Sequence, residues 1–228
     1  MHVFGIDASL GSGAACWMDE DRLLFEHTVR LPRGHPAALP GIVATVQAGA
    51  GLPLSALGLI AVGIGPGSFT GLRSAIALAR GLAAGLGCPV VGVTQGEAAL
   101  AVVGPEIAGR QLWMALDGRG DSVLLERDGT AARVPLTALP APAGPVAVAG
   151  EAAIAVAARL AAAGHDVKLL DVRAPSIAGL ARAGLRRVRS GAPARPVEPL
   201  YAEPPAALPP RGGLREPPAA LQAEARSA

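Results

Sequence analysis

The segment from Val62 to Arg73, VGIGPGSFTGLR, constrains the fold of this chain more than any other stretch. The apolar run 59–64 is short and bounded by turn residues, which is typical of a strand buried on both faces. A Gly-Pro-Gly triplet interrupts it, and a helix is expected to begin at once, with Ser68 or Thr70 as its N-cap. A second apolar strand, 90–93, comes after this helix. The pattern predicts a strand, helix and strand of an α/β protein.

The residues before this segment predict three antiparallel strands and a helix. Strands are expected at 3–7, 14–18 and 23–29, joined by turns of small or acidic residues. A helix from about 35 to 48 follows, with apolar residues along one face. Three antiparallel strands followed by alternating helices and parallel strands is the arrangement of a ribonuclease-H-like lobe.

The stretch 113–125 repeats the pattern of the opening: an apolar strand that ends in Asp117, a small turn and an apolar return strand. Such a repeat suggests duplication and therefore two lobes that begin alike. The second lobe is the shorter one. Its further elements are expected to be strands at 146–150 and 167–170 and helices at 151–163 and 175–188.

Two lobes that each open with an Asp-ended hairpin resemble the actin, sugar-kinase and Hsp70 (ASKHA) superfamily, in which a nucleotide lies between the lobes. The resemblance implies an α/β fold of two ribonuclease-H-like lobes, the second reduced. We expect a first lobe at 1–100 with partner-binding helices, and a smaller lobe at 101–190. A Pro/Arg-rich extended tail is expected at 191–228, with one strand-like patch at 197–201.

Composition narrows the function classes. Only 3% of the residues are aromatic, which argues against a module that stacks single-stranded bases. Cys16 and Cys88 have no paired spacing, and no secretory leader precedes them, so reduced thiols in the cytosol are expected. Charged and turn residues interrupt the apolar stretches before they reach membrane-spanning length. We therefore expect a cytoplasmic protein without a membrane partner.

Arginines gather on one helix-like stretch of the C-terminal third, at Arg182, Arg186, Arg187 and Arg189. They could meet tRNA phosphates, in which case binding would depend steeply on salt. A solvated helix face rich in arginine gives the same pattern. Both interpretations stay open at the level of sequence.

The opening turn carries the first candidate site. Asp7 and Ser9, with glycines close by, could hold a magnesium-bound phosphate. The neighbouring Ala8, Leu10 and the alanines of the return strand supply no further polar groups. We therefore expect a degenerate nucleotide site, formed by Asp7 and Ser9 with Asp117 of the second hairpin.

The glycine-rich segment 65–71 also suggests a phosphate loop, but a Walker A loop needs a lysine that this segment lacks. Close helix packing is the better interpretation, because small residues recur along one face of the helix that follows. Together with the apolar face of the preceding helix, this face is expected to form a partner interface. Its expected members are His35, Leu39, Ile42, Val43, Val46, Gly71, Ser74, Ala75, Ala77, Leu78, Gly81 and Leu82.

Neither catalytic nor metal-binding residues emerge from the motifs. The four histidines are scattered without the spacing of a zinc site. Ser68 lies outside any Gly-x-Ser-x-Gly nucleophile elbow, because Phe69 and Thr70 follow it directly. We therefore expect no catalytic residue and no metal ligand set in this chain.

Several motifs together resemble the bacterial TsaB (YeaZ) family, and the string GPGSFTGLR is the most specific of them. The resemblance covers about residues 3–125 and extends to a late Pro-x-Tyr region. The matching segments are Gly5 to Ser9, His35 with Leu39-Pro40, Gly65 to Arg73, Ala79 to Ala83, Leu116 to Arg119, and Pro196 to Tyr201.

The resemblance implies a non-catalytic subunit in the formation of N6-threonylcarbamoyladenosine in tRNAs that read codons beginning with A. Its partners would be a TsaD-type paralogue, which carries the catalytic cleft, and the ATPase TsaE. ATP and a metal would belong to those partners, and tRNA would be met through the complex. Alone, the chain would form homodimers through the two helices of the expected partner interface.

The chain departs from the family pattern at Ser122 and Leu124, where an acidic residue and an aromatic are usual, and in its proline-rich tail. An alternative is an independent enzyme, either a weak ATP hydrolase or an M22-like peptidase. Asp7 and Asp117 motivate the ATP hydrolase.

Overall fold

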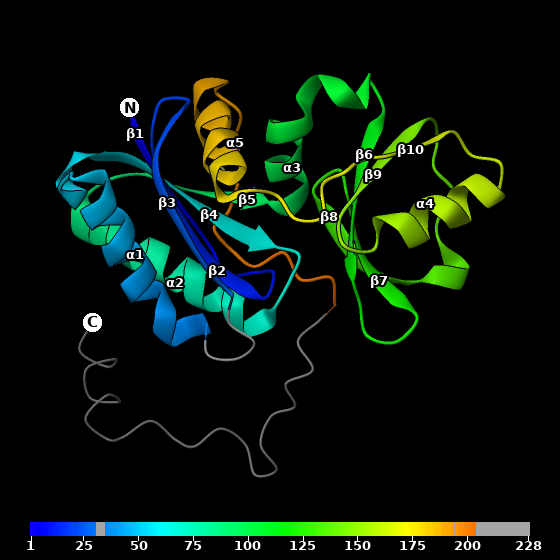
Figure 1. The fold of residues 1–228 in the computed structure, drawn as a ribbon, viewed down its shortest axis with the longest axis horizontal. Helices are drawn as coiled ribbons and strands as arrows, with labels where there is room; N and C mark the ends of the chain where they lie inside the picture. The colour runs from blue at the N-terminus through cyan, green and yellow to red at the C-terminus, as the bar shows by residue number, and fades with distance from the viewer. Residues whose placement is uncertain (31–34, 194, 204–228) are drawn as a thin grey trace, which may run out of the picture.

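The computed structural model of the chain describes residues 1–30, 35–193 and 195–203. They form two five-stranded mixed sheets that lie side by side, each with helices on its faces (Figure 1). We call the first sheet with α1, α2 and α5 the first lobe, and the second sheet with α4 the second lobe. The α/β fold of two lobes expected from the sequence is confirmed.

The first sheet has the strand order β3-β2-β1-β4-β5. β1 pairs antiparallel with β2 and parallel with β4, so a hairpin is joined to a parallel unit through one central strand. The central strands are apolar on both faces, because helices cover both faces of the sheet. The strands of this first sheet are β1 (His2–Asp7), β2 (Ser12–Asp19), β3 (Arg22–Arg30), β4 (Leu57–Gly65) and β5 (Val90–Thr94).

Helices α1 (His35–Ala50) and α2 (Phe69–Leu86) cover one face of the first sheet, where they share a core with Phe4, Trp17 and Ile60. Ser68 is the N-cap of α2, since its side chain accepts a 3.3 Å hydrogen bond from the N–H of Gly71. Of the two N-caps predicted, the structure therefore selects Ser68. None of the described helices has both the length and the apolar character needed to cross a membrane.

Helix α5 (Ile177–Arg189) covers the opposite face of the first sheet. The approach is close, because a Cβ on Gly184 would lie 2.6 Å from the Cβ of Ala61. From its position in the sequence, this helix was expected in the lobe at 101–190. Its apolar face instead completes the core of the first lobe, so the structure corrects that expectation for residues 177–189.

The second sheet has the order β10-β9-β6-β7-β8, and α4 covers its outer face. Helix α3 (Gln95–Val103) lies between the two lobes: Ala98 packs in the core shared with α5, and Ala99 in that of the second sheet. The division expected at residue 100 falls inside this helix and stays a prediction. The other elements are β6 (Gln111–Asp117), β7 (Ser122–Arg127), β8 (Thr130–Pro135), β9 (Val146–Ala149), α4 (Ala153–Ala162), β10 (Val167–Leu169), and three 3-10 turns at Leu54–Ala56, Gly104–Ile107 and Leu136–Ala138.

The start of the expected tail is ordered against the rest of the chain. The N–H of Leu200 donates a 2.7 Å hydrogen bond to the carbonyl of Ile64 at the end of β4. Residues 197–201, expected to be strand-like, do not form a regular strand. The bond from Leu200 to β4 is flanked by bends at 197–198 and 202–203. Residues 204–228 of the expected tail lie outside the described residues.

Candidate functional site

The turn after β1 holds a closed hydrogen-bond network around Asp7. The carboxylate accepts bonds from the N–H of Ser9 (3.2 Å) and from its hydroxyl (2.9 Å). Gln95, the first residue of α3, donates from Nε2 to the hydroxyl of Ser9 at 2.7 Å and to Asp7 at 3.5 Å. Burial raises the pKa of Asp7, and these hydrogen bonds offset only part of that effect.

This network does not fit a divalent metal. Each carboxylate oxygen of Asp7 already accepts a hydrogen bond from Ser9, so a metal ion would have to displace those donors. Gly63 on β4 makes room for the carboxylate, because a Cβ there would lie 2.0 Å from Oδ1. Across the described residues, no group of three or more histidine, cysteine, aspartate or glutamate side chains is placed to hold a metal ion.

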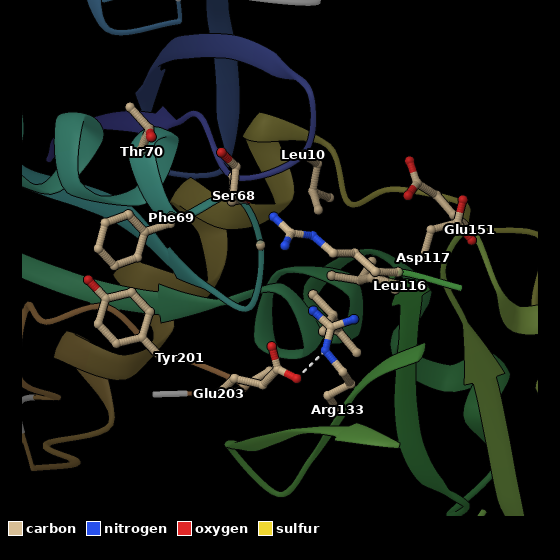
Figure 2. A pocket seen from close by; sticks show the side chains of 16 residues that line it. Leu10, Ser68, Phe69, Thr70, Leu116, Asp117, Arg133, Glu151, Tyr201 and Glu203 are labelled. Atoms are coloured by element: carbon tan, nitrogen blue, oxygen red, sulfur yellow. Dashed lines mark ion pairs between the residues drawn. The ribbon is translucent and has the colours of Figure 1, made fainter. Parts of the chain in front are cut away.

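A cavity of about 680 Å³ opens between the lobes (Figure 2). Ser9 and Asp117, expected to share a site, line it together, whereas Asp7 lines a separate cavity of about 590 Å³. The structure thus brings Ser9 and Asp117 to one cavity, whereas Asp7, which is hydrogen-bonded to Ser9, faces the other. The first cavity is lined by Ser9, Leu10, Gly67, Ser68, Phe69, Thr70, Leu116, Asp117, Gly118, Arg119, Leu124, Arg133, Glu151, Tyr201, Ala202 and Glu203.

The second cavity has a mixed charge. Asp7, Glu26 and Glu151 contribute carboxylates, and Arg30 and Arg173 contribute guanidinium groups. Glu151 lines both cavities, so the two spaces adjoin at the start of α4. Their polar lining comes from both lobes, which makes the space between the lobes the candidate site for a small polar ligand.

The glycines of the GPGSFTG segment serve close packing rather than phosphate binding. A Cβ on Gly71 would lie 1.9 Å from the carbonyl oxygen of Ala8, and one on Gly67 would lie 2.4 Å from that of Ser9. The N–H of Ser68 also donates a 2.8 Å bond to the carbonyl of Ser9. The segment therefore fixes the start of α2 against the Asp7 turn. The sequence predicted close packing here, but against another helix rather than a turn.

Half of the expected partner surface is inside the chain's own core. The apolar face of α1 packs on the first sheet, and Gly71 and Ala75 face the same way on α2, so these side chains are not available to a partner. The buried members are Leu39, Ile42, Val43, Val46, Gly71 and Ala75. The others differ: Ala77 and Gly81 are exposed, while Ser74, Leu78 and Leu82 are half-buried. The side chain of His35 lies outside the described residues.

The arginines of α5 mostly have partners within the chain. Arg187 forms an ion pair with Glu97 on α3, and Arg189 forms one with Glu20. Arg182 reaches the carbonyl of Asp21 at 3.4 Å. Arg186 lies beside Arg182 and Arg189 in a shallow pocket at the surface. These pairings reduce the positive charge that the sequence alone suggests for this helix.

Sequence reasoning missed a buried acid between the lobes. Glu126 on β7 is 3% exposed, and its carboxylate accepts a 2.8 Å hydrogen bond from the N–H of Gly96. Burial raises its pKa to about 7. The sequence signal for this buried acid is a single glutamate that directly follows the apolar run 123–125.

Two lobes, each opening with an antiparallel hairpin that continues into parallel strands, with a polar space between them, define a protein of the ASKHA type. Comparison with known proteins gives the family. The family described as TsaD, tRNA N6-adenosine threonylcarbamoyltransferase, matches residues 30–188. The chain belongs to this family, and within it to the TsaB (YeaZ) group.

Two curated bacterial proteins match part of the chain. The tRNA threonylcarbamoyladenosine biosynthesis protein TsaB of Escherichia coli (strain K12) is 35% identical over 95 residues, which cover 41% of this chain and 40% of that protein. The tRNA N6-adenosine threonylcarbamoyltransferase of Paracoccus denitrificans (strain Pd 1222) is 37% identical over 39% of this chain and 30% of that enzyme. These matches span less than half of either curated relative.

The solved structure of YeaZ from Pseudomonas aeruginosa superposes with a TM-score of 0.68. It is 26% identical in sequence and covers 88% of this chain and 99% of that one. The similarity to a TsaB-like fold therefore extends over nearly the whole described chain.

Proposed function

We propose that this chain takes part in the biosynthesis of threonylcarbamoyladenosine in tRNA as a non-catalytic subunit. It pairs with a TsaD-type threonylcarbamoyltransferase, and a TsaE-type ATPase joins the pair. Family membership supports the pathway, and the closed network around Asp7 is the observation that carries the non-catalytic role. ATP and a metal act in the partner proteins, and tRNA is met through the complex in the cytoplasm.

The network at Asp7 supports this role because it occupies the groups that an active cleft would use. The hydroxyl of Ser9 donates a hydrogen bond to Asp7 and accepts one from Gln95, so neither side chain is free to position a metal or a water. The fold uses Asp7 and Ser9 to join the opening turn to Gln95 at the start of α3.

The exposed part of α2 is the proposed partner surface. Ala77 and Gly81 lie one turn apart on the helix and are both exposed, and nothing lies within 4 Å of where a Cβ on Gly81 would be. Small side chains let the backbone of a partner helix approach closely. Ser74, Leu78 and Leu82 border this strip. In the absence of a partner, the same surface pairs two copies of the chain.

Substitution at Gly81 tests the surface. Gly81→Glu places a charged side chain where a partner helix would pack, so binding to the TsaD-type protein, measured by calorimetry, should fall below detection. Ala158→Glu, on the exposed side of α4 in the second lobe, is the matched control and should bind as the wild type does. Equal affinity of all three proteins would contradict the proposed surface.

The alternative is an enzyme in its own right, a weak ATP hydrolase or an M22-like peptidase. The space between the lobes favours it, because Ser9 and Asp117 from different lobes line the same cavity. It predicts ATP binding by the isolated chain and loss of any hydrolysis in Asp7→Ala. No heat of ATP binding, and activity unaffected by the substitution, would exclude the hydrolase.

A further inference from the structure

Residues 195–203 cross from one lobe to the other. Arg195 donates to the carboxylate of Glu97 at 3.1 Å, and Leu200 is bonded to the end of β4. Further on, the N–H of Arg133 on β8 donates a 3.2 Å bond to the carbonyl of Ala202. We call residues 195–203 the strap. Because contacts to both lobes hold it, the strap is a fixed part of the surface beside α2.

The strap places Tyr201 against the start of α2. The rings of Tyr201 and Phe69 are stacked, with centroids 5.3 Å apart and an angle of 24° between their planes (Figure 2). Phe69 is nevertheless 39% exposed, whereas Phe4, Trp17 and Trp113 are fully buried. Tyr201 is half-buried, so the pair presents mainly the ring of Phe69 to solvent, and an aromatic ring at a surface is a favoured contact residue.

Arg73 completes this arrangement. Its guanidinium lies over the ring of Phe69, 4.1 Å from the centroid, and its Nε donates a 2.9 Å hydrogen bond to the hydroxyl of Tyr201. Stacking and the Nε bond fix the plane of the group. Within the part of the chain that the structure describes, its two Nη atoms make no hydrogen bond and no ion pair. An oriented guanidinium fork is the complement of a carboxylate, which it binds through two parallel bonds.

A groove of about 480 Å³ runs between α2 and the strap beside this fork. Arg80, two turns along α2 from Arg73, lines the same groove, with Ala77 between them. It too is exposed and has no ion pair among residues 1–30, 35–193 and 195–203. The floor contains Val197 and Pro199 of the strap. The groove is thus lined by two arginines whose positions on α2 are about 10 Å apart, beside apolar residues of the strap.

We propose that this groove binds a helix of the partner protein that carries carboxylates two turns apart, one bound by the fork of Arg73 and the other by Arg80. This inference rests on the proposed function and extends the partner surface from the exposed strip of α2 onto the strap. An RNA phosphate is the competing anion, and Glu198 in the groove would repel either of the two. The apolar residues Val197 and Pro199 of the groove suit a packed protein helix better than a phosphate backbone, so the protein carboxylate is the favoured ligand.

The test is calorimetric titration of the full chain with the TsaD-type protein from the same source. Arg73→Ala should raise the Kd about tenfold, as expected for loss of a bidentate charged pair. Arg73→Lys should recover only part of the affinity, because lysine keeps the charge but lacks the fork. Arg22→Ala, a substitution at a 74% exposed arginine outside the groove, is the control and should leave the Kd unchanged. Circular dichroism and the melting temperature establish that each variant is folded.

The outcomes separate this inference from the function on which it rests. If Gly81→Glu abolishes binding while Arg73→Ala leaves the Kd unchanged, the groove is not part of the interface and the proposed function stands. If the wild-type chain does not bind the TsaD-type protein at all, both fail. If Arg73→Ala leaves the protein Kd unchanged but weakens binding of tRNA to the chain tenfold, the fork serves a phosphate and the carboxylate proposal is overturned.

Discussion

The backbone N–H of Gly96 donates a 2.8 Å hydrogen bond to the carboxylate of Glu126. A buried acid of the second lobe therefore caps the first turn of α3, a helix that packs on the first lobe. A Cβ on Gly96 would lie 2.7 Å from Oε1 of Glu126, so a larger residue would displace the carboxylate. Burial raises the pKa of Glu126, and the neighbouring Glu97 raises it further. Hydrogen bonds from Thr94 and Gly96 and the charge of Arg195 act in the opposite direction.

The raised pKa of Glu126 predicts a loss of stability as the pH rises. The pKa moves from 4.5 to about 7 on folding, so the folded state binds the proton more tightly between these values. The free energy of unfolding should therefore fall from pH 4.5 to 7, by about 3 kcal/mol from this group. In Glu126→Gln this contribution disappears, which urea unfolding across that pH range would measure.

Glu106→Gln, at an exposed position, is the control for removal of one carboxylate. The difference in stability between Glu126→Gln and the wild type should grow toward neutral pH, whereas Glu106→Gln should follow the wild-type curve. A constant difference for Glu126→Gln from pH 4.5 to 7.5 would contradict the assigned pKa.

Two glycines of α2 should respond to alanine in opposite directions. In Gly71→Ala the new methyl group would overlap the carbonyl of Ala8, so we expect a loss of about 2 to 3 kcal/mol. In Gly81→Ala the methyl group enters open space within a helix, so stability should rise by up to about 1 kcal/mol. Thermal unfolding of both variants measures this, and a stabilising Gly71→Ala would contradict the close approach of the opening turn.

Glu97 should contribute more to stability than a surface ion pair. Burial alone would raise its pKa, but hydrogen bonds from the N–H of Thr94 and from Arg187 outweigh that effect, so the pKa is lowered. Glu97→Ala removes the capping box of α3 and leaves Arg187 and Arg195 without their shared carboxylate. We expect a loss of about 2 to 4 kcal/mol at pH 7, measured by urea unfolding. A loss below about 0.5 kcal/mol would show that solvent replaces these contacts.

The lowered pKa of Glu97 also gives the sign of its pH dependence. Its contribution is present above the unfolded value of 4.5 and is lost as the pH falls through the lower folded value. Glu97→Ala should therefore approach the stability of the wild type in strong acid. A deficit that stays constant down to pH 2 would indicate lost packing rather than lost charge.

Much of the fold could be read from local patterns. The apolar run at 14–18, the buried run at 59–64 and the N-cap at Ser68 each depend on neighbouring residues, and the structure confirms them. Helix α3 was missed because its nine residues, QGEAALAVV, carry weak periodicity, and its position depends on contacts with both lobes.

The candidate site was harder to predict because its contacts join distant segments. An apolar helix face such as that of α1 fits a partner or the chain's own sheet equally well, and only the tertiary structure shows that Leu39 and Val46 belong to the core. The strap could not be foreseen, since the partners of Arg195 and Tyr201 lie 98 and 128 residues away.

The most direct test of the central proposal is light scattering on size-exclusion chromatography, with the chain alone and then mixed with the TsaD-type protein from the same source. The account predicts a new complex of one chain with one partner, which Gly81→Glu prevents and Ala158→Glu leaves intact. Separate elution of the two proteins, with the partner and the TsaE-type ATPase shown to be active, would contradict a subunit role and favour the independent enzyme.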